Sequence, residues 1–118
     1  MPNALKGEVA FVAGETTYTL ALTTNAIVEV ETVCGGEDIA TIIQRWQAAP
    51  SLTTLRTLLW GALRTHHDGL SLLDVGNLID EVGPNGMEAL GEALGQVIRF
   101  RLSGPETAPA GKPAGRKR

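Results

Sequence analysis

Near the N-terminus, apolar and polar side chains alternate with a period of two. Residues 7–12 and residues 17–22 both follow this period, with Phe11 and Tyr18 on their apolar faces. Gly14 lies between the two segments and supplies a turn signal, because glycine adopts positive φ without strain. The pattern predicts a β-hairpin. Since two strands alone are marginal in water, the apolar face of this hairpin must pack on another part of the chain.

The rest of the chain has apolar residues at helical spacing. Residues 25–34 are rich in β-branched side chains, so a strand competes with a helix there. A helix is favoured, because Glu29 and Glu31 would otherwise share one strand face beside Val33. Further helices are predicted to begin at Glu37-Asp38 and to span residues 51–66, 71–82 and 86–102, with a turn at 83–86. The predicted fold class is α+β: an N-terminal β-hairpin packed on a small bundle of about four to five helices.

The predicted core is mainly aliphatic, because aromatic residues make up only 4% of the chain. Trp46 lies on the isoleucine face of its helix and is expected in the core. Gly91 and Gly95 lie one turn apart and could let a neighbouring helix approach closely. The helix over residues 51–66 is expected to bury one face, made of Leu52, Leu55, Leu59, Ala62 and Leu63.

Charge divides the chain into two parts. Residues 1–105 hold six basic and twelve acidic residues, a net charge of −6, whereas residues 106–118 carry a net charge of +3. We expect a single domain over residues 1–104 and a disordered basic tail over residues 105–118, which has no large apolar side chain to bury. The acidic body argues against binding of nucleic acid. The tail is read as a solvated extension, and contact with an acidic partner or nucleic acid is left open.

The sequence gives no sign of a membrane protein or a secreted protein. No apolar run approaches the roughly 18 residues that a membrane span needs. The N-terminus lacks the apolar stretch of a signal peptide, and one cysteine excludes an internal disulfide framework. We therefore expect a soluble protein of the cytoplasm.

No group of residues predicts catalysis, a metal site or a cofactor. The histidines of His66-His67-Asp68 would point about 100° apart on a helix, and a zinc site needs more ligands. A polar helix C-terminus explains them better. The carboxylates of Asp80-Glu81 are expected on a solvated face, and Cys34 is expected to be a buried, inert thiol. The chain is therefore predicted not to be an enzyme.

Trp60 is the residue that best suggests a partner. It projects about 125° from the leucine face of its helix, among Arg56 and Arg64. A tryptophan among arginines suits a protein–protein anchor, although another helix or the hairpin could instead cover it. Phe100 also lies off the apolar face of its helix. The candidate partner-binding residues are Arg56, Trp60, Arg64 and Phe100.

Over residues 5–100 the chain resembles the small tail-assembly chaperones of phages and gene transfer agents. The resemblance rests on Gly7-Glu8-Val9-Ala10, Tyr18-Thr19-Leu20, Thr23-Thr24-Asn25-Ala26-Ile27, Glu29, Glu31, Gly35, Glu37-Asp38-Ile39-Ala40 and Leu55 to Leu63. It implies a non-enzymatic protein of the host bacterial cytoplasm. Such a protein binds apolar helices of the tape-measure protein and aids assembly of the tail-tube protein around them, with Arg56 and Arg64 forming a polar rim around Trp60.

Two other functions stay open. One is a structural part of the particle, such as a minor tail component or a head–tail connector. The other is a small DNA-associated regulator that uses the basic tail, against which the acidic body counts. The sequence also leaves open whether the chain forms a homo-oligomer.

Overall fold

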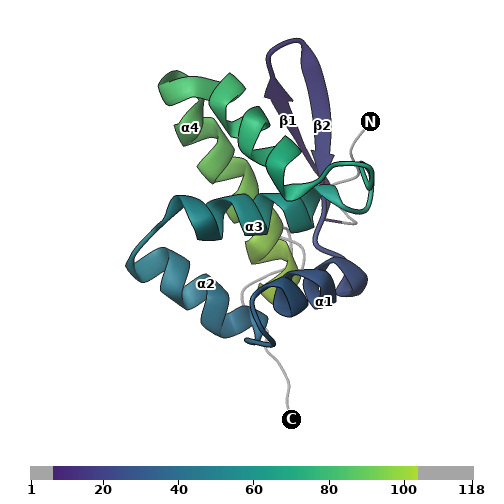
Figure 1. Cartoon of the computed structure of the whole chain (residues 1–118), viewed down its shortest axis with the longest axis vertical. Helices are drawn as coiled ribbons and strands as arrows, with labels where there is room; N and C mark the ends of the chain where they lie inside the picture. The colour runs from purple at the N-terminus through teal and green to yellow at the C-terminus, as the bar shows by residue number, and fades with distance from the viewer. Residues whose placement is uncertain (1–6, 104–118) are drawn as a thin grey trace.

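Over the residues that the structure describes, the fold is an antiparallel two-stranded hairpin followed by four helices, which confirms the predicted α+β class (Figure 1). A computed structural model describes residues 7–103. The predicted tail over residues 105–118, and the domain boundary beside it, lie outside the described residues. In chain order the elements are β1 (Val9–Ala13), β2 (Thr16–Leu20), α1 (Thr24–Val33), α2 (Ile39–Ala48), α3 (Leu52–Leu63) and α4 (Leu72–Ser103).

The hairpin forms in the part of the sequence where the alternating pattern predicted it. β1 and β2 pair antiparallel with Phe11 opposite Tyr18, and Gly14 has a positive φ of 62° in the turn. Phe11 and Leu20 are buried, because β1 packs on α4 and β2 packs on α3. Figure 1 shows the hairpin standing beside α4. The helices thus supply the apolar platform that two strands need.

α3 is the central element of the fold. It crosses the middle of the molecule, with α1 and α2 on one side and the hairpin and the first part of α4 on the other, while the last part of α4 passes behind it (Figure 1). Every residue from Thr57 to Leu63 is buried, including Leu58, which the predicted leucine face did not contain. The prediction for Leu52 is wrong, because this residue lies on the first turn of α3 and is 69% exposed.

Side-chain caps fix where the helices begin. Thr23, Asp38 and Ser51 each accept a hydrogen bond from the backbone N–H three residues later. Ser71 and Asp74 cap α4 reciprocally, with each backbone N–H donating to the other residue's side chain at 3.0 Å. These caps confirm the predicted starts. The predicted end of α3 is wrong, because the helix ends at Leu63 rather than at His66.

α4 is broken at Gly83, whose φ of 70° and ψ of 176° belong to a region that essentially only glycine adopts. Pro84 then opens the second part of the helix, a position that tolerates its missing N–H. The predicted turn over residues 83–86 is therefore too long, because Asn85 and Gly86 are already helical. Val75, Leu78, Leu90, Leu94, Val97 and Ile98 of α4 are buried, whereas Ile79, Val82 and Met87 are partly buried.

α1 is a helix, as favoured over the competing strand, and it buries Ile27 and Val30. Val33, the last residue of α1, is 45% exposed. The close helix approach occurs at Gly61 of α3, where a Cβ would collide with the Val30 side chain of α1. The expectation for Gly91 is wrong, because nothing lies within 4 Å of a Cβ placed there.

Candidate partner-binding surface

The four residues predicted to bind a partner do not form one surface. Arg56 lies on the side of α3 that faces the first part of α4. Arg64 follows the end of α3 beside α1, and Phe100 lies on the last part of α4. Trp60, which lies between Arg56 and Arg64 in the sequence, is buried and only 8% exposed. Of the four, Trp60 and Arg64 contact each other, whereas Arg56 and Phe100 lie elsewhere.

Trp60 is a core residue, so of the two alternatives that the sequence left open for it, cover by the rest of the chain is the correct one. Its ring belongs to the buried cluster, and the guanidinium of Arg64 lies 5.1 Å from its centroid. A cation over an indole face is attracted by the ring quadrupole. The leucine face alone did not predict this burial, because every residue of α3 from Thr57 to Leu63 is buried, whereas its first turn carries the exposed Leu52 and Thr53. The uninterrupted apolar run from Leu58 to Leu63 was the sequence signal for this burial.

Arg64 is already engaged within the chain. Its guanidinium donates to the backbone carbonyl of Asp68 at 3.1 Å and lies 3.8 Å from a carboxylate oxygen of Glu29 on α1. Together with its contact on Trp60, these interactions fix the Arg64 side chain between the end of α3 and α1. Arg64 is thus a weak candidate for a partner contact.

Phe100 packs against the chain where it leads into the hairpin. The ring covers Gly7, whose φ is +77° and whose missing side chain makes room for it. A pocket of about 300 Å³ lies beside the ring, lined in part by Leu22, Val97 and Arg101. Phe100 is half-buried, so its main contact is with this chain.

A groove between α3 and the first part of α4 is the surface best suited to a partner. Its volume is about 270 Å³. Leu52 is 69% exposed at this groove, and Ile79 is half-buried in it. Exposed large aliphatic side chains on adjacent helices form a surface on which another helix can pack. The lining residues are Leu52, Thr53 and Arg56 from α3 and Gly76, Ile79 and Asp80 from α4.

Arg56 lies across the groove with an unsatisfied donor. A Cβ on Gly76 would lie 3.4 Å from its Cδ atom, so the arginine stem rests against the backbone of α4. Its Nε atom is buried and has no hydrogen-bond partner. A buried donor without an acceptor costs about 1–3 kcal/mol. Asp80, on the α4 side of the groove, is exposed.

Sequence reasoning found Arg56 and missed its neighbours. Leu52 was assigned to the core because it follows the leucine periodicity of α3. Asp80 was expected on a solvated face. The signal for a shared surface was the spacing of four residues from Leu52 to Arg56 and from Gly76 to Asp80, which places each pair on one helix face.

The two histidines after α3 contact the hairpin. Nε2 of His67 accepts a hydrogen bond from the backbone N–H of Thr19 at 3.1 Å, and its ring packs edge-on against Tyr18. Nε2 of His66 lies 3.1 Å from a carboxylate oxygen of Glu8. Burial, aided by the nearby His66, holds the pKa of His67 below its usual value. These residues therefore connect the loop to the hairpin, which sequence analysis did not predict.

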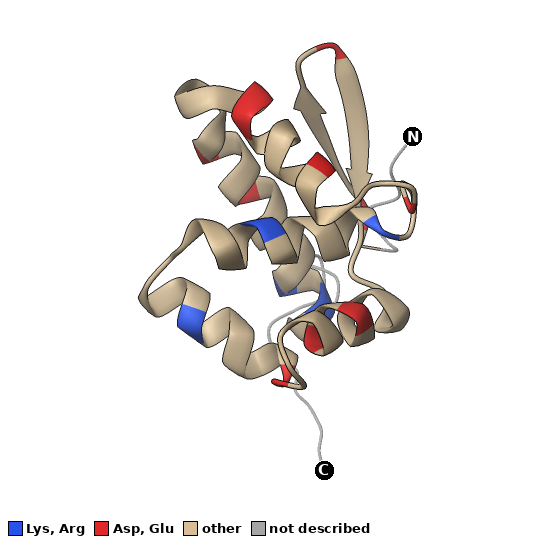
Figure 2. Cartoon of the chain, in the orientation of Figure 1, with Lys and Arg blue, Asp and Glu red and all other residues tan. Residues whose placement is uncertain are grey.

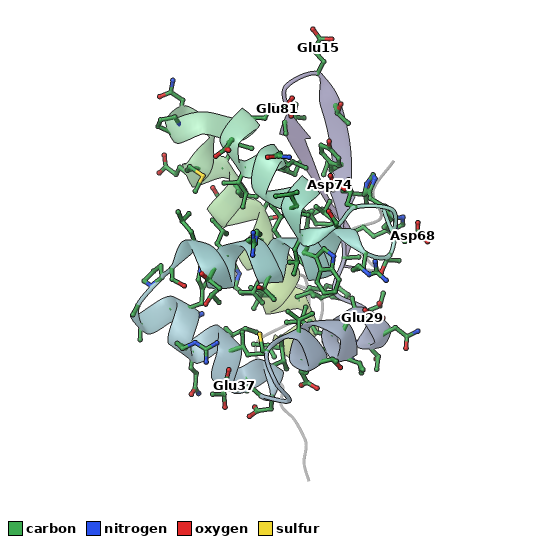
Figure 3. The ribbon with its side chains drawn as sticks, in the orientation of Figure 1. Glu15, Glu29, Glu37, Asp68, Asp74 and Glu81 are labelled. Carbon is green, nitrogen blue, oxygen red and sulfur yellow. The ribbon has the colours of Figure 1, made fainter. Side chains whose placement is uncertain are left out.

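Acidic side chains are spread over the molecule. Figure 2 shows them on the hairpin, on α1 and along α4. The carboxylates labelled in Figure 3 lie at separate places around the fold, from Glu15 at the hairpin tip to Glu37 before α2. Within residues 7–103, no three His, Cys, Asp or Glu side chains are grouped so that they could hold a metal ion.

Cys34 is half-buried, and burial raises the pKa of its thiol, which Arg45 only partly offsets. A raised thiol pKa keeps the nucleophilic thiolate scarce. None of the helices in the described range is both long enough and apolar enough to cross a membrane. No protein-family model, curated protein or solved structure matches this chain.

Proposed function

We propose that this chain is a non-enzymatic tail-assembly chaperone of a phage or gene transfer agent. In this proposal it acts in the host bacterial cytoplasm, binds apolar helices of the tape-measure protein and aids assembly of the tail-tube protein around them. The proposal joins the sequence resemblance over residues 5–100 to one structural observation, the open groove between α3 and α4. Neither a substrate nor a cofactor is part of this function.

The groove supports the proposal because it leaves apolar surface uncovered on two adjacent helices. Leu52 is 69% exposed there, and Ile79 lies beside it on α4. A third helix that packs into such a groove buries its apolar stripe and removes these side chains from water. Long apolar helices that await assembly need this kind of cover.

The decisive experiment is capture of partners from the producing cell during particle assembly. The full chain, carrying an affinity tag, should retain the tape-measure protein and the tail-tube protein. A tagged chain with Leu52→Ser serves as the matched control and should retain less of the tape-measure protein. If neither protein is retained by the unchanged chain, the proposal is wrong.

A structural role in the particle is the second candidate. The same exposed Leu52 would then lie in a permanent interface of a minor tail component or head–tail connector. Protein analysis of purified particles separates the two functions. A chaperone is absent from mature particles, whereas a structural component is present in a fixed ratio to the other tail proteins.

A further inference from the structure

The helix α2 covers apolar surface on its neighbours but buries little of itself. It packs on α1 and α3 at the edge of the bundle (Figure 1). Two of its ten residues, Ile42 and Ile43, are buried, whereas α3 buries nine of twelve. A helix of ten residues is marginal in water without packing, and segments with few buried apolar contacts open at a lower free energy than the core. These features predict that α2 opens while the rest of the fold stays closed.

We propose that α2 is a displaceable cover, and that the surface of α1 and α3 beneath it binds a partner helix when α2 moves away. This inference rests on the proposed function and deepens it, because it adds a second binding surface and the means by which access to that surface is regulated. The partner is an amphipathic helix with large apolar side chains at three- and four-residue spacing. The reason is that α2 itself occupies the surface with such a stripe, made of Ile39, Ile42, Ile43 and Trp46.

The connections on both sides of α2 allow this movement. Gly35 and Gly36 join α1 to α2 with positive φ angles of 78° and 92°. In the described part of the chain nothing lies within 4 Å of a Cβ placed on either glycine, so no packing holds this connection in place. Glycine changes φ and ψ at low steric cost, as a hinge requires. At the other end, the exposed Ala49 and Pro50 separate α2 from α3.

A carboxylate of α1 holds the start of α2. Oε2 of Glu31 accepts a hydrogen bond from the Ile39 N–H at 2.9 Å. That N–H lies in the first turn of α2, where no carbonyl within the helix can accept from it. The negative charge also stabilises the N-terminal end of the helix dipole. Within residues 7–103, this is the one hydrogen bond that joins α2 to another helix, so Glu31 sets the balance between the closed and open states.

Hydrogen exchange of the full chain measures the opening. The backbone amides of residues 43–48 in α2 should exchange at least about tenfold faster than those of residues 57–63 in α3. Glu31→Ala should raise the exchange of α2 about a further tenfold, because a hydrogen bond to a charged group is lost. Glu29→Ala is the matched control on the same helix, since Glu29 lies beside Arg64 and should not affect α2. Equal exchange of α2 and α3 would overturn the inference.

Binding to the uncovered surface is tested with a synthetic peptide of residues 37–49, which carries the apolar stripe of α2. In the full-length variant Ile42→Ser/Ile43→Ser, the chain's own α2 no longer covers the surface. By titration calorimetry, this variant should bind the peptide at least about tenfold more tightly than the unchanged chain does, because α2 no longer competes from within the same molecule. A peptide with the same two substitutions should not bind. A folded double variant that fails to bind the unchanged peptide would contradict the inference.

Glu31→Ala decides the matter if the double variant does not fold. A ligand that binds only the open state gains affinity in proportion to the open fraction. Glu31→Ala should therefore bind the peptide about tenfold more tightly than the unchanged chain, by the same factor as its exchange increases, and Glu29→Ala should not. Faster exchange without tighter binding would refute the surface assignment. A concentration-dependent dimer of Glu31→Ala would identify α2 of a second copy as the occupant and would also refute it.

These results are separable from the proposed function, because the chain and the peptide are tested without any other protein of the particle. If α2 opens and the peptide binds but the tape-measure protein is not captured, the function fails and the displaceable cover stands. If the tape-measure protein is captured but α2 does not open separately from α3, the function stands and this inference is wrong.

Discussion

Gly61 lets α1 and α3 approach each other, because a side chain there would collide with Val30. Val30 is fully buried and β-branched, so it cannot easily move aside. We expect Gly61→Ala to lower the free energy of unfolding by about 1–3 kcal/mol, despite the better helix propensity of alanine. Urea denaturation measures this change.

The matched control for Gly61 is Gly91 in α4, where nothing lies within 4 Å of an added Cβ. Gly91→Ala should leave stability unchanged or raise it by up to about 1 kcal/mol, since alanine favours the helix. If both substitutions have the same effect, close packing at Gly61 is not what selects glycine there.

Trp60 stabilises the fold and does not form an exposed anchor for a partner. It is 8% exposed and lies within the buried cluster. Trp60→Ala should therefore lower the free energy of unfolding by about 3–5 kcal/mol, through lost burial and the cavity left behind. A thermal melt checks this, with Leu73→Ala as an exposed control expected to stay within about 0.5 kcal/mol. An unchanged melting curve for Trp60→Ala would place its ring outside the core.

At the scale of elements, the chain from β2 into α1 is fastened to the end of α3. The Ala21 N–H donates to the carbonyl of Ala62 at 2.8 Å, within α3. The Thr19 N–H donates to His67, in the loop after the helix. These contacts join segments more than 40 residues apart in sequence. These contacts fix the hairpin against α3. One of them pairs a backbone N–H of the hairpin, that of Thr19, with a titratable acceptor, the His67 ring.

This fastening predicts a dependence of stability on pH. His67 can accept the Thr19 N–H through Nε2 only while that nitrogen is unprotonated, and burial lowers its pKa in the folded chain. The stabilisation is therefore fully present above the unfolded pKa of about 6.5 and is lost as the pH falls through the lowered folded value. The neighbouring groups that face this site are His66, Glu8 and Tyr18.

Urea denaturation at pH 7.5 and at lower pH values measures this effect. The unchanged chain should lose stability on acidification, and His67→Gln should lose less, because glutamine does not titrate. His66→Gln is the adjacent control, since His66 lies against Glu8 rather than the Thr19 N–H. If His67→Gln keeps the full pH dependence, other groups are responsible for it.

At the scale of the whole molecule, hairpin and helices share one core. Phe11 of β1 is 5% exposed within the buried cluster, whereas its neighbour Val12 is 61% exposed. We expect Phe11→Ala to lower the free energy of unfolding by about 3–5 kcal/mol and Val12→Ala to change it little. The signals of the hairpin and of the helices should still melt together, because neither part has a core of its own. Two separate transitions would contradict a shared core.

Local sequence was sufficient for the elements and for the residues at which the helices begin. The alternation around Phe11 and Tyr18 predicted the hairpin, and Asp38 and Ser51 marked helix starts that the structure confirms. Gly83 and Pro84 marked the break in α4. Such signals act through hydrogen bonds and backbone angles within a few residues, so they can be recognised without knowing the fold.

The tertiary structure decided which faces are covered. A helical period identifies an apolar face, but only the positions of neighbouring helices determine how much of that face is covered. Trp60 is buried because α3 lies at the centre, and Leu52 is exposed because the side of the first turn that carries it is left uncovered. The sequence by itself thus determined the hairpin, the helices and their caps. Packing between distant segments decided the core position of Trp60 and the groove beside Arg56, since burial depends on contacts far apart in the chain.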